Sequence, residues 1–479
     1  MEDSAKKIKV TGVVVALNLA YWLAPGNVAY LIGQQREVLL FRYSEGRLTG
    51  QLAVLALSLV SLYLVWAQNP QARRERYCKV ITVGLGLVAG LIIFDSGYRL
   101  MRKPLYTKTA EVYHRRSNQT VKGVYRDRPK TRFSYPNPAP GYPDATYTLT
   151  TDAQGFRNRN DQGRHQVIVL GDSFVEGSQV SDGETWPQLY ATRSGKSVYN
   201  LGMSGTDPTG YVQTMKLYGG SHQPEIVCCM IYEGNDFRGS GELVDRIKER
   251  ETWSRQMQRY FKNSPVRIAT HSAMVQAFSF ESHGPSDHQA PSAVMSGLSW
   301  LPIPIPDGPR ARYYTFPIKM LVAHLEDRQQ FEQSAGCRTV FLALGELRGI
   351  CQEIGSRLVV LYAPDQAHVV MPLIRERLEA PELRAFLALK AKGLPSAAET
   401  EEMLFQNLEV QERTIADFCR REGIEFQTLT PDLRAAILQG EQTYYTYDEH
   451  WTPIGHRIVA ERVHRYLETT VANASQMHP

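Results

Sequence analysis

In the segment Val167-Ile168-Val169-Leu170-Gly171-Asp172-Ser173-Phe174-Val175-Glu176-Gly177, four apolar residues precede a glycine and a lone serine. The run Val167–Leu170 is mostly β-branched and predicts a short buried strand. Gly171 ends that pattern, and Ser173 falls in the turn that follows. In an open α/β sheet, residues beyond the carboxyl ends of the strands line the ligand-binding edge. Ser173 is therefore a candidate nucleophile, although an ordinary N-cap serine would give the same pattern.

Strand and helix patterns alternate through the rest of this region. The predicted strands cover 167–170, 197–201, 226–232, 357–363 and 424–429. The predicted helices cover 185–193, 210–217, 339–354, 408–421 and 453–467. Strands separated by helix-length segments indicate a parallel sheet with crossover connections. We therefore expect an α/β fold, namely a three-layer α/β/α, flavodoxin-like domain.

Composition changes divide the 479 residues into several regions. We expect a membrane region at 1–103, a basic and then proline-rich linker or strap at 104–146, and a short tail at 471–479. The α/β domain would occupy 147–237 and 336–470. The segment 238–335 is too long for a simple loop, so we predict an inserted cap there.

The first hundred residues contain long uncharged stretches. Residues 51–67 and 80–94 carry no charge and, with their flanks, are about long enough to cross a bilayer. Residues 10–32 form a weaker candidate, because Asn18, Pro25, Gly26 and Asn27 interrupt them. A cleaved signal peptide fits poorly, because two further apolar stretches follow. We expect about three transmembrane helices, and thus an integral membrane protein.

Basic residues give the orientation of these helices. One group lies at the amino terminus and a second between the last two spans: Lys6, Lys7, Lys9, Arg73, Arg74, Arg76 and Lys79. If both groups face the cytoplasm of a bacterial cell, three spans place the domain on the periplasmic side of the inner membrane. A two-span protein would place it on the other side. The net charge of +5 is mild and does not indicate a nucleic-acid partner.

Three further segments carry polar groups suited to a serine nucleophile. Asn200–Asp207 follows the second strand, and its Gly205 could bring a main-chain N–H close to a substrate oxygen. Tyr232–Asp236 ends the third strand and offers the Asn235 amide. Tyr447–His456 precedes the last helix, where His450 could serve as the base and Asp448 could orient it. Each segment alone is ordinary turn chemistry.

Taken together, these segments resemble the SGNH (GDSL-like) hydrolase superfamily over roughly residues 150–470. Gly171-Asp172-Ser173-Phe174 matches the first block of the family, Gly205 the second, Gly234-Asn235-Asp236 the third and Asp448/His450 the last. The resemblance implies that Ser173 is the nucleophile and His450 the general base. It also implies an oxyanion hole formed by the N–H groups of Ser173 and Gly205 and the side chain of Asn235. It requires neither a metal nor a cofactor.

The last block departs from the common family pattern. The family places its aspartate three positions before the histidine, where this chain has Tyr447. The form Asp448-x-His450-Trp451 is instead similar to the SGNH-like domains of alginate O-acetyltransferases. We therefore expect an esterase that removes O-acyl, most simply O-acetyl, groups from a cell-envelope or secreted polysaccharide. An O-acetyltransferase, which would need a membrane partner to deliver acyl groups, is the alternative. A non-catalytic glycan-binding or assembly subunit is less favoured, because none of the four blocks lacks its key residue.

Overall fold

The computed structural model describes residues 2–23, 38–39, 43–67, 69–101, 106–108, 113–127, 141–159, 163–177, 179–237, 300–305 and 312–477. Parts of several predicted segments lie outside this range, among them residues 24–32 of the first candidate span, 104–105, 109–112 and 128–140 of the linker or strap, 238–299 and 306–311 of the predicted cap, and 478–479 of the tail.

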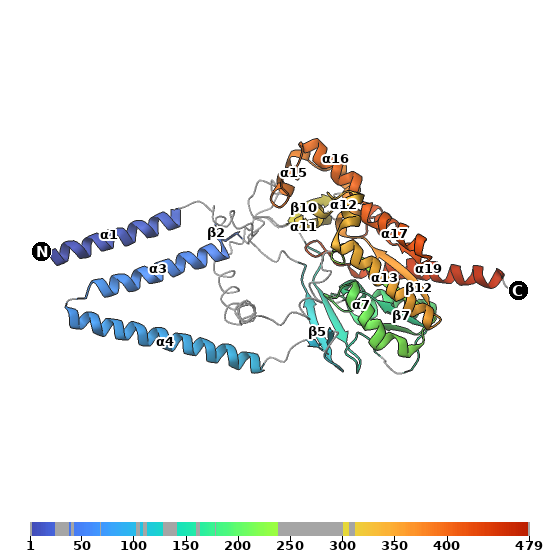
Figure 1. The fold of residues 1–479 in the computed structure, drawn as a ribbon, viewed down its shortest axis with the longest axis horizontal. Helices are drawn as coiled ribbons and strands as arrows, with labels where there is room; N and C mark the ends of the chain where they lie inside the picture. Colours follow the sequence, from blue (N-terminus) through green and yellow to red (C-terminus); the bar gives the residue numbers. More distant parts are fainter. Residues whose placement is uncertain are drawn as a thin grey trace.

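Five parallel strands form the central sheet (Figure 1). They are β7 (Val167–Leu170), β8 (Val198–Asn200), β9 (Ile226–Tyr232), β12 (Arg357–Ala363) and β13 (Glu425–Thr428). Their order is β13-β12-β9-β7-β8, and Val167 of β7 pairs with Ile226 on one side and Val198 on the other. Numbered along the chain, this order is the 2-1-3-4-5 arrangement of flavodoxin-like sheets.

Helices cover both faces of the sheet and bury alternate residues of each strand. Val167 and Val169 belong to one core cluster, and Ile168 and Leu170 belong to the other. The first face is covered by α6 (Trp186–Ser194), α14 (Gln366–Ile374), α18 (Thr430–Leu438) and α19 (Pro453–Met477). The second is covered by α7 (Pro208–Thr214), α13 (Ala335–Glu353) and α17 (Val410–Glu422). The prediction of a three-layer, flavodoxin-like α/β/α domain is confirmed.

Several elements escape the sequence patterns. The unpredicted helices are α14, α11 (Ile318–Ala323), α12 (Arg328–Gln333), α15 (Ala380–Ala388) and α16 (Ala397–Asn407), with single turns at Asp182–Glu184, Gly220–His222 and Arg375–Arg377. The turn Met215–Gly219 continues the helix predicted over 210–217. β10 (Trp300–Ile305) and β11 (Arg312–Pro317) form a hairpin.

The end of the segment predicted as a cap packs inside the domain. Tyr314 and Phe316 of β11 and Leu321 of α11 are completely buried in the first core cluster. A cap over the site would leave these large apolar side chains partly exposed, whereas here they help to fill the core between sheet and helices. For residues 312–335, the structure therefore corrects the predicted cap.

The segment predicted as a linker contains strands. These are β3 (Tyr106–Lys108), β4 (Tyr113–Arg115) and β5 (Thr120–Tyr125); β5 pairs antiparallel with β6 (Ala145–Thr150). Asp127, just after β5, is buried and accepts hydrogen bonds from the main-chain N–H groups of Thr446 and Tyr447. Residues 113–127 thus lie against the domain as ordered structure, as a strap over the domain would and a free linker would not.

Three helices precede the domain and extend away from it: α1 (Glu2–Leu23), α3 (Glu45–Val65) and α4 (Pro70–Met101), with the short strands β1 (Val38–Leu39) and β2 (Tyr43–Ser44) before α3 (Figure 1). Among the described residues, one stretch, Pro70–Ser96 of α4, is long and apolar enough to cross a membrane. The apolar part of α3, Gly50–Val65, is shorter, and α1 opens with charged residues. Among the described residues, one helix could therefore cross a membrane by its length and composition; the expectation of about three spans depends in part on residues outside the described range.

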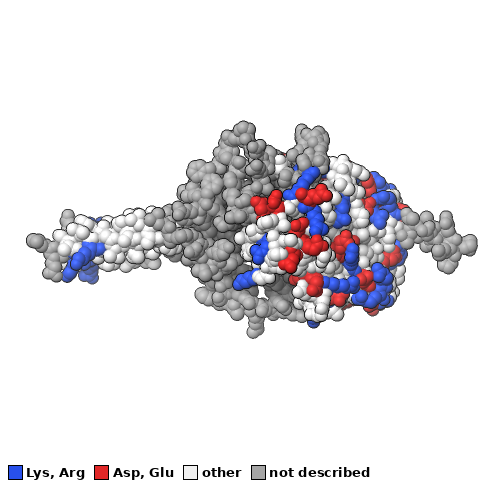
Figure 2. Space-filling model, turned by 90° about the horizontal axis from the view of Figure 1, so that it is seen from above, with Lys and Arg blue, Asp and Glu red and all other residues white. Residues whose placement is uncertain are grey.

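The basic groups Lys6–Lys9 of α1 and Arg73–Lys79 of α4 gather at the end away from the domain, whereas Arg47 and Arg99 belong to the opposite ends of α3 and α4. Lys7 Nζ donates to the Ala67 carbonyl, which brings the start of α1 to the turn between α3 and α4. Figure 2 shows the resulting cluster of Lys and Arg near the free end, followed by a stretch without charge. The two basic groups of the sequence thus lie on one side, and the domain lies on the other.

Candidate active site

Ser173 begins a short helix at the point where the order of the sheet reverses. β7 ends at Leu170, and α5 (Ser173–Glu176) starts three residues later. Asp172 caps this helix by accepting a hydrogen bond from the Phe174 N–H at 2.9 Å. β7 lies between β8, on one side, and β9, on the other, so the sheet grows in opposite directions from this strand. In such sheets, ligands bind outside the carboxyl ends of the strands at this switch point. Ser173 is 8% exposed, so its hydroxyl lies in a nearly closed setting.

His450 and Asp448 reach Ser173 from the loop before α19. His450 Nε2 lies 2.7 Å from Ser173 Oγ, and its Nδ1 hydrogen-bonds to Asp448 Oδ1. Thr452 caps the helix that follows, with its hydroxyl accepting from the Gly455 N–H at 3.3 Å. Glu449 points elsewhere and lies 3.6 Å from Lys319 Nζ. The structure thus brings Ser173 together with His450 and Asp448, which lie more than 270 residues later in the chain, in one hydrogen-bonded series.

The surroundings of His450 favour its protonated form. Burial alone would lower the pKa of the imidazole, but the Asp448 carboxylate outweighs it, and the pKa is raised above its ordinary value. The ring stacks on Phe174 with centroids 5.0 Å apart, and Phe174 in turn contacts Tyr232 and Trp451. Gln179 Nε2 also lies 3.1 Å from His450 Nδ1. Contacts with Asp448, Gln179 and Phe174 thus restrict the rotation of the His450 ring away from Ser173.

Asn235 and Gly205 lie in the loops after the neighbouring strands. Asn235 Nδ2 donates to Asp172 Oδ2 at 3.0 Å, so the amide lies beside the residue that precedes Ser173. Gly205 has a φ of +81°, a conformation that favours glycine. Its loop is bonded to the turn that carries Ser173, because the Met203 N–H donates to the Gly171 carbonyl at 3.0 Å. Asn235 is thus bonded to the residue before Ser173, and the loop that contains Gly205 is bonded to the turn that carries Ser173.

Two contacts at this site come from residues without any sequence signal. Glu176, three residues after Ser173, is completely buried and accepts from the N–H and hydroxyl of Ser204, next to Gly205. The Tyr125 hydroxyl donates to Asp448 Oδ2 at 3.0 Å. Neither residue belongs to a recognisable motif, and Tyr125 precedes the predicted domain altogether.

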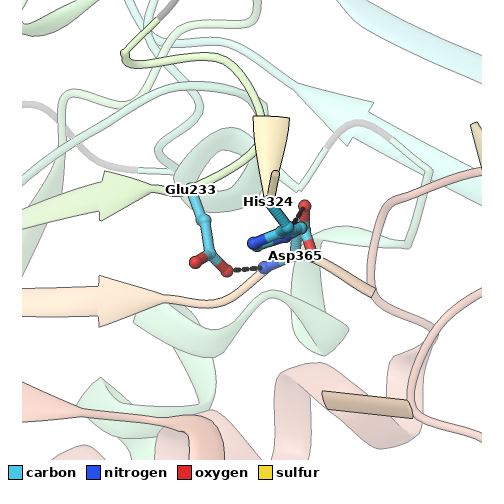
Figure 3. A group of neighbouring side chains, drawn as sticks. All are labelled: Glu233, His324 and Asp365. Carbon is cyan, nitrogen blue, oxygen red and sulfur yellow. Dashed lines mark hydrogen bonds and ion pairs between the residues drawn. The ribbon is translucent and has the colours of Figure 1, made fainter. Parts of the chain in front are cut away.

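A buried charged cluster lies at the ends of β9 and β12, where Glu233, His324 and Asp365 converge (Figure 3). His324 Nε2 lies 3.0 Å from Asp365 Oδ2, and the Asp365 main-chain N–H donates to Glu233 Oε2 at 2.9 Å. His368 Nδ1 lies 3.0 Å from the same glutamate oxygen.

Each of these two carboxylates faces a histidine. Burial opposes ionisation of Asp365, but His324 outweighs it and lowers the pKa to about 2. Burial likewise disfavours a charged His368, but Glu233 outweighs it and raises the pKa to about 9. Carboxylates and an imidazole with ligand atoms within 4.8 Å of one another could hold a metal ion. However, each of the four carboxylate oxygens already faces a hydrogen-bond donor. The arrangement therefore fits two buried, hydrogen-bonded histidine–carboxylate pairs, His324–Asp365 and His368–Glu233, that fix the strand ends beside the site.

No protein-family model and no curated protein sequence matches this chain. Among solved structures, it is similar to a member of the lipolytic protein G-D-S-L family from Veillonella parvula, with 10% identity, 62% of this chain and 94% of that chain covered, and a TM-score of 0.29. A GDSL-like lipase from Bacteroides thetaiotaomicron gives 10% identity, 64% and 88% coverage and a TM-score of 0.28. A gut microbial diltiazem-metabolizing enzyme is 12% identical, with 64% of this chain and 47% of that chain covered and a TM-score of 0.25. Because the TM-scores are below 0.5, these matches assign neither an activity nor a substrate to this chain.

Proposed function

We propose that this protein is a membrane-anchored serine esterase of the SGNH type that removes O-acyl, most simply O-acetyl, groups from a cell-envelope or secreted polysaccharide. One observation carries the proposal. His450 Nε2 lies 2.7 Å from Ser173 Oγ, while the other ring nitrogen of His450 faces Asp448. A serine hydroxyl is a weak nucleophile, and this pairing is what activates it.

The chemistry follows from these contacts. Ser173 Oγ attacks the ester carbonyl carbon and passes its proton to His450 Nε2. Asp448 stabilises the imidazolium, and the carbonyl oxygen becomes an oxyanion within reach of the Ser173 N–H, the Gly205 N–H and the Asn235 amide. The alcohol then leaves with the proton from His450, and an acyl group remains on Ser173. Water, activated by His450, releases it as the acid.

The membrane helices support a substrate at the cell envelope. One stretch of α4 is long and apolar enough to span, and the two basic groups Lys6–Lys9 and Arg73–Lys79 lie at the end of the helices away from the domain. Because Lys and Arg residues that flank membrane spans are enriched on the cytoplasmic side, this arrangement favours a domain on the periplasmic side of the inner membrane. An esterase tethered there would meet acylated polysaccharide.

Transfer of an acetyl group to such a glycan is the second candidate. It is favoured by the form Asp448-x-His450-Trp451, which resembles the last block of alginate O-acetyltransferases. Hydrolysis and transfer share the acyl-enzyme on Ser173 and differ only in whether water or a sugar hydroxyl accepts the acyl group. A transferase would draw its acyl groups from a membrane partner.

The test measures release of p-nitrophenol from p-nitrophenyl acetate by the full-length protein in detergent. Ser173→Ala should abolish turnover and leave the melting temperature unchanged, whereas Ser221→Ala, at an exposed serine, should leave turnover intact. Equal activity in Ser173→Ala would refute the assignment. Mass spectrometry of the acyl-enzyme, with and without an acceptor sugar, separates the two candidates: only a transferase acetylates the sugar.

A further inference from the structure

The segment 113–127, which contains β4 and β5, touches the proposed catalytic acid. Tyr125 ends β5, and its hydroxyl donates to Asp448 Oδ2, whereas His450 uses the other oxygen, Oδ1. Burial first, and then the charges of Asp448 and Asp127, raise the pKa of Tyr125. The phenol therefore remains protonated and acts as a donor. The carboxylate is held at both oxygens, one by the base and one by this segment.

Asp127 fixes the main chain that leads to this carboxylate. Its Oδ2 accepts from the Thr446 N–H at 2.7 Å, and its Oδ1 accepts from the Tyr447 N–H at 2.8 Å. The Tyr142 N–H donates to Oδ2 as well, at 2.7 Å. Asp127 is 2% exposed, so little water competes for these bonds. The backbone directly before Asp448 is thus clamped from outside its own loop.

The same segment reaches the other side of the site. Arg115, the last residue of β4, pairs through its Nε with Glu176 Oε1, and Glu176 Oε2 accepts from the Ser204 N–H at 3.2 Å. Glu176 belongs to the helix of the nucleophile, and Ser204 precedes Gly205. Arg115 therefore neutralises the buried carboxylate that holds the Gly205 loop.

We propose that Tyr125 and Asp127 are positioning residues for the Asp448–His450 pair, so that the segment 113–127 is part of the catalytic apparatus. This rests on the proposed esterase function. A carboxylate that could rotate away from His450 would stabilise the imidazolium less well when the proton moves from Ser173. Tyr125 acts through Asp448 and has no proposed contact with the ester. Removing its hydroxyl should therefore slow the chemical step and leave substrate binding unchanged.

The test uses the full-length protein with p-nitrophenyl acetate and, in parallel, covalent labelling of the serine by a fluorophosphonate probe. Tyr125→Phe should lower kcat about tenfold with KM unchanged, the loss expected for one hydrogen bond to a charged group. Labelling should slow by a similar factor. Tyr147→Phe is the matched control, because that ring lies over Gly123 on the same hairpin and should leave kcat unchanged.

A double-mutant cycle separates positioning from a general loss of structure. In an Asp448→Asn background, Tyr125→Phe should cause no further loss, because the partner that it holds is already disabled. Asp127→Asn, which keeps the side-chain size, should lower kcat at unchanged KM and provides a second arm if Tyr125→Phe fails to fold. The positioning role alone would be overturned if the wild type is active and Tyr125→Phe has the same kcat. It would also be overturned if Tyr125→Phe lowers kcat by the same factor in the wild-type and Asp448→Asn proteins. A wild type that neither hydrolyses the ester nor takes up the probe would overturn the proposed function, and this role with it.

Discussion

Replacing Asp448 by asparagine should lower kcat more than the corresponding replacement of any neighbouring acidic residue. Asp448 Oδ1 faces His450 Nδ1 and keeps the proton on that nitrogen, so that Nε2 is free to accept the proton of Ser173. An asparagine amide would turn its NH₂ toward Nδ1 and favour the opposite tautomer, in which Nε2 carries the proton. The substitution would also remove the charge that stabilises the imidazolium in the transition state.

The size of the loss can be worked from this contact. Two unit charges about 4 Å apart, at an effective dielectric constant of about 20, interact by about 4 kcal/mol. Since each 1.36 kcal/mol is about a factor of ten in rate, the lost charge alone accounts for about three decades. The wrong tautomer adds to this, so Asp448→Asn should lower kcat by about 10³- to 10⁴-fold.

The assay is hydrolysis of p-nitrophenyl acetate across a pH series, with circular dichroism to check the fold. Glu449→Gln is the matched control, because Glu449 pairs with Lys319 at the rim of the loop and should cost less than about threefold. kcat/KM of the wild type should fall on the acid side as His450 takes up its proton, at a pH above the ordinary histidine value of about 6.5, because its pKa is raised. In Asp448→Asn this limb should move to lower pH. A larger loss in Glu449→Gln than in Asp448→Asn would refute the reasoning and reassign the orienting acid.

Three further outcomes are expected. Asn235→Ala should lower kcat about 10²- to 10³-fold in the same assay with little change in KM, because it removes an oxyanion donor; unchanged kcat would exclude Asn235 from that role. The pair of His368 with Glu233 should stabilise the fold fully below pH about 6.5 and lose its effect as pH rises through about 9, because the pKa of His368 is raised in the folded state. Urea unfolding should therefore show a larger loss in Glu233→Gln at pH 6 than at pH 10, and an equal loss would contradict the ion pair. A C-terminal alkaline phosphatase fusion should be active in intact bacteria; activity only from a fusion reporter that works in the cytoplasm would reverse the proposed topology.

The sequence predicts the sheet well because buried parallel strands leave a strong pattern. Each of the five strands lies within a residue or so of its predicted position, since both faces of the sheet are covered and apolar runs mark them. Helix α14 was not predicted, because Gln366–Ile374 is almost entirely buried, contains Pro372 and so lacks an amphipathic period. Helix α13 starts at Ala335, earlier than predicted, because Ser334 caps it through the Cys337 N–H.

The positions of the motifs relative to the predicted strands predict that Ser173, Asn235 and His450 meet at one edge of the sheet, because the carboxyl ends of parallel strands share that edge. It could not find Tyr125, whose hydroxyl contacts Asp448 across 323 residues of chain. No local pattern records such a contact, and the basic, proline-rich composition around it predicts a linker. The consequence is practical. A fragment that starts at residue 146 contains every motif of the site but lacks Arg115, Tyr125 and Asp127, and we expect it to lose activity through a misplaced acid even if its core folds. A fragment that starts near residue 104 retains all three, so comparing the kcat of the two fragments separates the motifs from the groups that hold them in place.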